Sequence, residues 1–254
     1  MLKRRTLIKT LAGIPLAAIL ADSKLAHATA QTLETVGLTT SSGLPVSAAL
    51  ALPKVTPAPA VLLIHEWTGL NDQIKSMAHE FAREGYVALA IDLYKGQVAT
   101  DIDTAKKYMN EVDAVEATQT LTAWIDWLRA SSKVNGKVAT CGWCFGGGWS
   151  LNASIAAPVD ATVIYYGRVT RKAEELARLH GPVLGHFATL DKTINAEMVG
   201  GFEQEMKAAG KDKTLTVHWY EADHAFANAT GARYDDADAK LAWQRTLAFL
   251  KSSL

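Results

Sequence analysis

Short apolar runs along the chain alternate with stretches in which apolar residues recur at helical spacing. The run Ala60–Ile64 is unbroken, which is typical of a strand buried on both faces of a sheet. In the next segment the apolar residues fall three and four positions apart, at Ile74, Met77, Ala78, Phe81 and Ala82. This spacing predicts a helix that packs one face on the sheet.

The same alternation continues to the C-terminus and predicts an α/β fold. Residues 33–39 and 46–52 flank the turn residues Ser41–Gly43 and predict an opening hairpin. Strands that alternate with helices form a mostly parallel sheet with helices on both faces, and ligands bind at the carboxyl ends of its strands. Further strands are expected at 86–93, 137–142, 161–166, 182–188 and 215–220, and helices at 113–131, 145–154, 171–179, 195–209 and 235–250.

The first 30 residues have the parts of an export signal. The basic start contains paired Arg4 and Arg5, an apolar run covers 11–21, and Ala-x-Ala spacings end at Ala28 and Ala30. The paired arginines resemble the twin-arginine type of signal, which exports proteins already folded. The apolar run is shorter than the roughly 20 residues that a membrane-spanning helix needs.

We therefore expect two parts in the chain: an export signal over 1–30 and a single domain over 31–254. The domain is expected in the periplasm or outside the cell, with no membrane span once the signal is removed. The 26 basic and 26 acidic residues balance, so the chain has no broad basic surface for nucleic acid. We expect a monomer.

Cysteine and histidine usage narrows the chemistry further. Two cysteines, Cys141 and Cys144, are too few for a disulfide framework. His224 is described below, and the other histidines show no pair at metal-ligand spacing: His27, His65, His79, His180, His186 and His218. We therefore expect neither a metal nor a cofactor.

A glycine-rich turn at the end of one predicted strand carries the main candidate for a nucleophile. Gly142-Trp143-Cys144-Phe145-Gly146 fits the nucleophile-elbow pattern, with Cys144 in the position usually held by serine. Glycines two residues either side are needed because the turn is sharp. The helix that starts there favours thiolate, and the Phe145 N–H points toward a substrate oxygen.

An acid and a histidine follow the nucleophile in the order that this fold requires. Asp191 comes after the strand that ends at Ala188, and His224 comes after the strand that ends at Tyr220. His224 would relay the proton, and Asp191 would fix the imidazole tautomer. The alternatives are a helix N-cap for Asp191 and a loop histidine for His224.

Several motifs together resemble the dienelactone hydrolase family, whose members have the α/β-hydrolase fold. They follow the family order over nearly all of 31–254: His65-Glu66-Trp67-Thr68-Gly69-Leu70-Asn71, Gly85-Tyr86-Val87-Ala88 to Asp92-Leu93-Tyr94, Gly142-Trp143-Cys144-Phe145-Gly146-Gly147, Tyr165-Tyr166-Gly167, Gly185-His186-Phe187 to Asp191, and Tyr220 to His224-Ala225-Phe226-Ala227. The resemblance implies an ester or lactone hydrolase with a Cys144, Asp191, His224 triad and a thioacyl intermediate.

The resemblance adds three groups to the site. Glu66 is implied to contact the thiol in the resting enzyme and to give way when substrate binds; the alternative is a surface residue that caps a helix. A carboxylate near sulfur disfavours thiolate, and a protonated thiol resists oxidation. The backbone N–H groups of Trp67 and Phe145 are implied to form the oxyanion hole. Because Trp67 and Trp143 flank Glu66 and Cys144 in the sequence, we expect both side chains near the pocket.

The chain departs from the family at two positions. Members that cleave dienelactone hold its carboxylate with two arginines, and the corresponding residues here are Gly96 and Asn228. Lys95 could substitute only as a flexible point charge, and Arg168 is another candidate cation. The sequence therefore supports the fold and the triad better than it supports a substrate that carries a carboxylate.

Two other classes of function remain as alternatives. Cys141-Gly142-Trp143-Cys144 is a C-x-x-C after a strand, so one alternative is a thiol-disulfide oxidoreductase. That chemistry would need neither Asp191 nor His224, and Cys141 also suits a small apolar core residue. The other alternative is a binding protein that keeps the fold without the chemistry.

Overall fold

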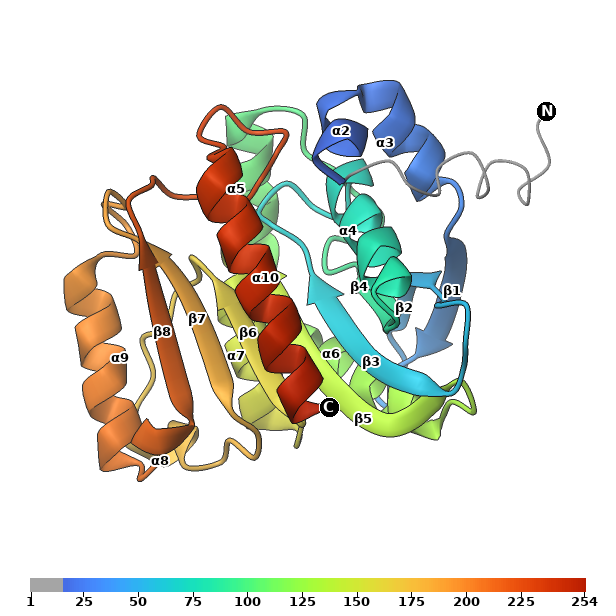
Figure 1. The fold of residues 1–254 in the computed structure, drawn as a ribbon. Helices are drawn as coiled ribbons and strands as arrows, with labels where there is room; N and C mark the ends of the chain where they lie inside the picture. Colours follow the sequence, from blue (N-terminus) through green and yellow to red (C-terminus); the bar gives the residue numbers. More distant parts are fainter. Residues whose placement is uncertain (1–15) are drawn as a thin grey trace.

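The structure is a computed structural model that describes residues 16–254, and its strands form one twisted sheet (Figure 1). The strand order is β1-β2-β4-β3-β5-β6-β7-β8. The first hairpin pairs antiparallel and joins β4 antiparallel, whereas every later pairing is parallel. The strands are β1 (Glu34–Thr39), β2 (Pro45–Ala51), β3 (Ala58–Ile64), β4 (Val87–Ile91), β5 (Val134–Trp143), β6 (Ala161–Tyr165), β7 (Val183–Ala188) and β8 (Leu215–Tyr220).

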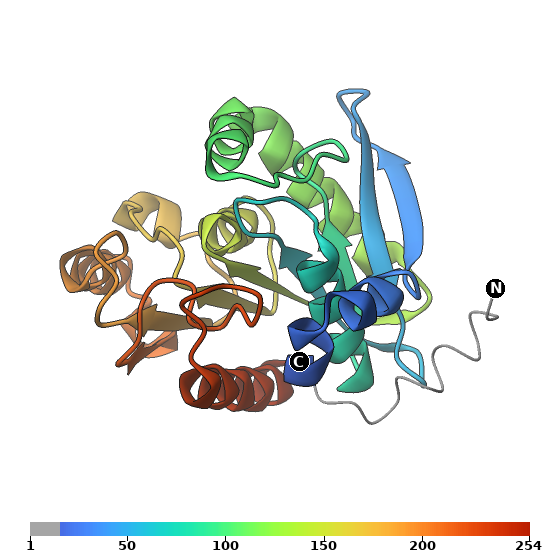
Figure 2. The same ribbon diagram turned by 90° about the horizontal axis from the view of Figure 1, so that it is seen from above.

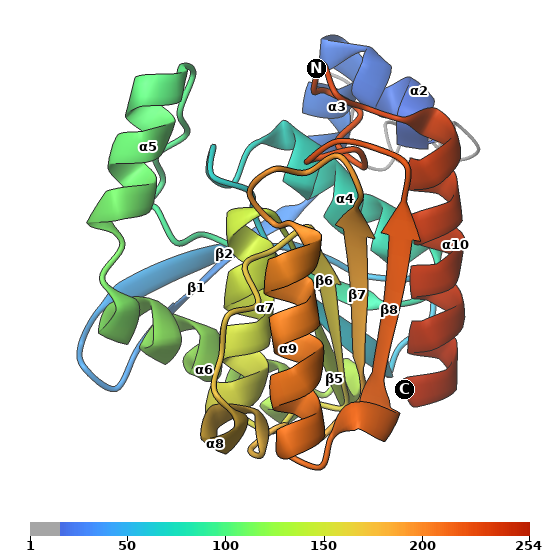
Figure 3. The same cartoon turned by 90° about the vertical axis from the view of Figure 1, so that its left-hand side faces the viewer.

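Helices cover both faces of the sheet, as Figures 2 and 3 show from two directions. One face carries α4 (Asp72–Arg83) and α10 (Asp236–Ser253). The other carries α6 (Ala114–Ala130), α7 (Phe145–Ala156), the short α8 (Ala173–Leu176) and α9 (Ala196–Ala208). The expected α/β-hydrolase fold, a mostly parallel sheet between two helical layers, is confirmed.

Side chains at helix starts explain why several boundaries fall where the sequence predicts. Asp113 precedes α6 and accepts the N–H groups of Val115 and Glu116, both at 2.9 Å. Asn195 caps α9 in the same way, since its side chain accepts the Met198 N–H at 3.0 Å. Each cap supplies an acceptor for an N–H that the helix itself leaves unpaired.

Two predictions about helices need correction. The helix expected over 171–179 is only Ala173–Leu176, and an unpredicted helix, α5, spans Ile102–Glu111. Of the α5 side chains only Ala105 is buried, so the helix has no apolar stripe that the sequence could reveal. A 3-10 turn at Asp212–Thr214 leads into β8.

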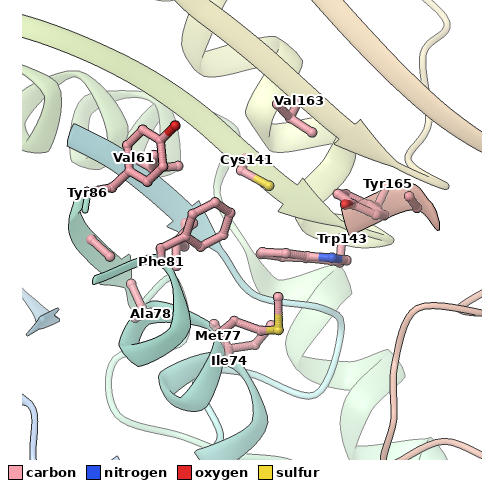
Figure 4. Close-up of a cluster of buried hydrophobic side chains, with 14 of the residues drawn as sticks. Val61, Ile74, Met77, Ala78, Phe81, Tyr86, Cys141, Trp143, Val163 and Tyr165 are labelled. Atoms are coloured by element: carbon pink, nitrogen blue, oxygen red, sulfur yellow. The ribbon is translucent and has the colours of Figure 1, made fainter. Parts of the chain in front are cut away.

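The largest group of buried side chains lies between the sheet and α4 (Figure 4). Val61 and Cys141 face Phe81 across this interface, and the Trp143 ring stacks on Tyr165 at 5.5 Å between centroids. Cys141 is fully buried and free, as a small apolar core residue would be. This packing fixes the end of β5 and therefore the residue that follows it.

Part of the expected signal is folded onto this same layer. Arg4 and Arg5 lie outside the described residues, but α2 (Leu16–Ala21) and α3 (Ser23–Ala30) contact α4. Ile19 and Leu20 are buried in the core cluster. Across residues 16–254 no helix has both the length and the apolar character needed to span a membrane.

The sheet topology places a site above its middle strands. β3 has β4 on one side and β5 on the other, so the chain moves outward from β3 in both directions. Such a reversal leaves a crevice at the carboxyl ends of the strands. The segments that follow β3, β5, β7 and β8 all start at this edge.

Candidate active site

Cys144 occupies a sharp turn between β5 and α7. Its φ of 53° lies in the left-handed region, which a residue with a side chain enters only where the surroundings hold it. The Cys144 N–H donates to the Tyr165 carbonyl at 3.0 Å. A Cβ on Gly146 would overlap the carbonyl oxygens of Ile64 and His65, so only glycine permits this close approach.

His224 joins Cys144 to Asp191. Its Nε2 lies 3.1 Å from the Cys144 Sγ, and its Nδ1 lies 2.5 Å from the Asp191 Oδ2. The structure thus brings together three groups separated by up to 80 residues in the chain. This geometry allows a proton to pass between sulfur and imidazole while the carboxylate fixes the ring.

Asp191 has two tasks in this arrangement. Its Oδ1 accepts the N–H groups of Thr193 at 2.8 Å and Ile194 at 3.0 Å, while its Oδ2 contacts His224. Asp191 caps no helix, since the N-cap of α9 is Asn195; its carboxylate holds the turn before α9 and contacts His224 at the same time. The turn holds the carboxylate rigid, which orients the imidazole in turn.

Electrostatics favour a charged imidazole in this setting. Burial lowers the pKa of His224, but hydrogen bonds to Asp191 and Cys144 and their negative charges raise it to about 10. For the acid Asp191 the effect of burial is the opposite, since it raises the pKa. Hydrogen bonds from His224, Ile194 and Thr193 outweigh it and bring the pKa of Asp191 below its usual value. The carboxylate is therefore ionised at neutral pH.

Glu66 lies just beyond the end of β3, buried and held from two sides. Its Oε1 accepts the Tyr166 hydroxyl at 3.1 Å, and its Oε2 accepts the Asn228 amide at 2.6 Å. Burial raises the pKa of Glu66, whereas these two hydrogen bonds and the positive charges of His224 and Arg233 lower it, and the net shift is upward. Neither hydrogen bond goes to Cys144, and the alternative of an exposed cap is wrong because the side chain is buried.

Trp67 and Phe145, whose N–H groups are expected to form the oxyanion hole, directly follow Glu66 and Cys144 in the chain. Phe145 is the first residue of α7, where an N–H has no acceptor within the helix. The Tyr94 hydroxyl donates to the Trp67 carbonyl at 3.1 Å and so holds the peptide between Trp67 and Thr68. His65, fully buried, stacks on the Phe145 ring at 5.8 Å between centroids and supports the same corner.

The positions where the family carries arginines have other partners here. The Gly96 N–H donates to the Asp92 carboxylate, with Gly96 at a φ of 85°. Lys95 is exposed and pairs with Glu116 at 3.0 Å. Asn228 donates to Glu66, and Arg168 is exposed.

Sequence reasoning assigned no role to two residues that act on the site. The Tyr166 ring packs edge-on against His224 at 5.2 Å, in addition to its hydrogen bond to Glu66. Arg233 acts electrostatically on Glu66 and pairs with Asp223 at 3.9 Å. Tyr166 was within reach of prediction, since it ends a predicted strand; Arg233 lies in an aperiodic loop.

The site has no cluster of metal ligands to add to these groups. Within residues 16–254, no three His, Cys, Asp or Glu side chains gather in a way that could hold an ion. The histidine that faces Cys144 has both ring nitrogens engaged, one by sulfur and one by carboxylate. Taken together, fold and site define an α/β-hydrolase type of enzyme with a cysteine at the elbow.

Comparison with known proteins identifies the family. The model of the dienelactone hydrolase family matches residues 46–254. Carboxymethylenebutenolidase from Pseudomonas putida is 28% identical over 232 residues, covering 85% of this chain and 95% of that protein. Carboxymethylenebutenolidase 1 from Cupriavidus pinatubonensis is 27% identical over 225 residues, which cover 85% of this chain and 95% of that protein.

A solved structure agrees at the level of the fold. A dienelactone hydrolase-like promiscuous phosphotriesterase from metagenomic libraries superposes with a TM-score of 0.78 at 23% identity, covering 87% of this chain and 98% of its own. The chain belongs to the dienelactone hydrolase family, and it is therefore a hydrolase.

Proposed function

We propose that the protein cleaves a carboxylic ester or lactone with Cys144 as nucleophile, His224 as proton relay and Asp191 as its orienting acid. The observation that carries the proposal is the continuous contact from Asp191 through His224 to the Cys144 sulfur, 2.5 Å and 3.1 Å long. The names of the carboxymethylenebutenolidase relatives support an ester or lactone as substrate.

In the acylation step the Cys144 S–H bond breaks, its proton passes to His224 Nε2, and the sulfur attacks the substrate carbonyl to form a carbon–sulfur bond. The carbonyl π electrons move to oxygen, which accepts hydrogen bonds from the Trp67 and Phe145 N–H groups. When the tetrahedral intermediate collapses, the carbon–oxygen bond to the leaving alcohol breaks, and His224 Nε2 donates its proton to that oxygen. A lactone opens by the same step, with the alcohol still attached.

In the deacylation step water attacks the thioester. His224 accepts the proton of the water, the carbon–sulfur bond breaks, and the acid is released. Asp191 stabilises the charged imidazole in both steps. The residues need no cofactor for this sequence, which begins and ends with the same protonation states.

Cys144→Ala separates this function from its alternatives. We expect kcat/KM on a panel of esters and lactones to fall by roughly a thousandfold or more, because the nucleophile is lost. Cys141→Ala is the matched control and should keep most of the activity, since Cys141 only packs in the core. Mass spectrometry should detect an acyl adduct on the wild type and none on Cys144→Ala.

Two other results would each support one of the alternative functions. Reduction of insulin that depends on both cysteines, without ester cleavage, would support a thiol-disulfide oxidoreductase. Binding of an ester with no turnover by the wild type would support a non-catalytic protein on the same fold.

We also propose that residues 1–30 direct export to the periplasm or the outside of the cell and that residues 31–254 are the functional domain. Support comes from the basic start with Arg4 and Arg5, the apolar run and the two Ala-x-Ala spacings.

A further inference from the structure

Two consecutive tyrosines, the last residue of β6 and the one after it, contact the elbow and the proposed proton relay. The Tyr165 carbonyl accepts the Cys144 N–H at 3.0 Å, and the Tyr165 ring stacks on Trp143, the residue before the nucleophile (Figure 4). The Tyr166 ring packs edge-on against His224 at 5.2 Å between centroids. The position of these two tyrosines therefore affects where sulfur and imidazole lie relative to each other.

A chain of buried hydroxyl and imidazole groups joins Tyr165 to α10, β7 and β8. The Tyr165 hydroxyl lies 2.6 Å from the Thr246 Oγ1 of α10, and this oxygen lies 2.9 Å from the His186 Nε2 of β7. The His186 Nδ1 lies 2.7 Å from the Tyr220 hydroxyl of β8. Thr246 and His186 are fully buried, so these bonds lie in a medium of low dielectric constant. The His186 carbonyl adds a second link, because it accepts the Tyr166 N–H at 2.8 Å.

The acceptors in this chain determine where its hydrogen atoms lie. Burial holds the pKa of His186 well below its usual value, so the ring is neutral and has a single N–H. Among the described residues the Tyr165 hydroxyl has one hydrogen-bond partner, Thr246, and it donates there because its hydrogen would otherwise be buried without an acceptor. Thr246 then donates to Nε2, and the Nδ1–H of His186 donates to the Tyr220 hydroxyl.

We propose that Thr246 and His186 are positioning residues, and that the chain of hydrogen bonds that starts at the Tyr165 hydroxyl keeps the elbow sulfur and the relay imidazole aligned for proton transfer. The inference rests on the proposed function, in which these two groups carry the reaction. A hydrogen bond fixes distance and direction together, which apolar contact alone does not. The chain acts on the elbow through Tyr165 and on the imidazole through Tyr166.

Thr246→Val tests this role, because valine has nearly the shape of threonine but no hydroxyl. The Tyr165 hydroxyl then loses its acceptor, and the His186 Nε2 loses its donor. We expect kcat for ester cleavage to fall by roughly tenfold to a hundredfold, since displacements of about 1 Å between reacting groups have effects of this size. KM should stay close to the wild-type value, because the loss falls on the transition state rather than on binding.

Thr246→Ser and Thr120→Val are the matched comparisons, each measured where near-ultraviolet circular dichroism shows a folded protein. Serine at 246 keeps the hydroxyl and should keep kcat near the wild-type value. Thr120 is also buried in a helix, α6, but its hydroxyl donates to the Glu116 carbonyl of the same helix, so its loss should leave kcat unchanged. The inference is wrong if Thr246→Val keeps the wild-type kcat, or if Thr246→Ser is equally slow, because packing of the methyl group would then be what matters.

Nitrogen NMR of the full-length wild type, labelled at histidine, supplies a measurement that needs no variant. We expect His186 to be neutral, with its proton on Nδ1 and with Nε2 unprotonated. The reverse tautomer would overturn the inference, because Thr246 would then accept from the ring rather than donate to it.

A second NMR signal separates this inference from the proposed function. The His224 Nδ1 lies 2.5 Å from the Asp191 carboxylate, so its proton should resonate far downfield in the wild type. We expect this resonance to shift in Thr246→Val and to stay in place in Thr246→Ser. If the wild type cleaves no ester, the proposed function fails, and an unchanged His224 resonance in Thr246→Val would overturn the positioning role as well.

Discussion

At residue 228 a neutral amide stands where the resemblance to the family implies an arginine that would hold a substrate carboxylate. A desolvated charge-assisted hydrogen bond contributes about 1.5–3 kcal/mol, so two missing anchors lower the preference for a carboxylated substrate by on the order of a hundredfold or more. We therefore expect comparable kcat/KM values for matched neutral and carboxylated esters.

Asn228→Arg provides the complementary measurement. The guanidinium would raise kcat/KM for the carboxylated ester relative to the neutral one if position 228 faces the bound substrate. Asn135→Arg, at an exposed position near the start of β5 and away from the elbow, should leave the ratio unchanged. A strong wild-type preference for the carboxylate would contradict the expectation and direct attention to Lys95, Arg168 or Arg233.

Single residues of the site differ in how far the sequence could reveal them. Cys144, Asp191 and His224 each follow a strand that hydrophobic pattern alone predicts, so their meeting at one sheet edge follows from topology. The partners of Glu66 are different, because the Tyr166 hydroxyl comes from 100 residues away and no local pattern encodes that distance. Only the folded chain shows which donors the carboxylate meets.

The elbow depends on how closely α7 approaches β6. A Cβ on Gly147 would lie 2.8 Å from both the Gly167 Cα and the Tyr165 carbonyl oxygen, which accepts the Cys144 N–H. Gly147→Ala must therefore move backbone, and we expect the free energy of unfolding to fall by roughly 1–3 kcal/mol, together with a loss of ester cleavage.

Gly201→Ala, in the middle of α9, is the control for that substitution. A Cβ there has no atom within 4 Å, so alanine should raise the free energy of unfolding by about 0.5–1 kcal/mol through helix propensity. Urea denaturation of both variants measures the two changes in the free energy of unfolding. If Gly147→Ala were as stable as Gly201→Ala, the close packing described for the elbow would be contradicted.

Elements with a strong periodic pattern were predictable, and elements without one were not. The stripe on α6 and the apolar run of β3 led to segments within two residues of the observed bounds. α5 was not predicted because Ala105 is its only buried side chain. The helix expected over 171–179 is confined to Ala173–Leu176, in which Leu176 is the one buried side chain. Burial, rather than intrinsic propensity, is what the pattern records.

At the scale of the whole molecule, the export prediction determines where the mature protein begins and in which compartment it acts. The exported protein should begin near Thr29 or Gln31, and N-terminal sequencing measures this. Replacing Arg4 and Arg5 together by lysine should strand the protein in the cytoplasm if the signal is of the twin-arginine type. An exported protein that still starts at Met1 would refute processing, and unimpaired export of the lysine variant would indicate the general secretory route.

If residues 1–30 are removed as proposed, the packing of α3 on α4 would make the rate of that cleavage depend on local unfolding. Ala30 and Thr29 are buried, and the backbone on either side of Ala28 is helical, so a protease reaches these bonds only when the helix opens. Where opening and closing are fast relative to cutting, the cleavage rate follows the equilibrium population of the open form. If the signal is cleaved at these bonds, two contacts that hold α3 on α4 would slow its removal: the Ser76 hydroxyl donates to the Ala26 carbonyl at 3.5 Å, and His27 lies 2.9 Å from Asp72.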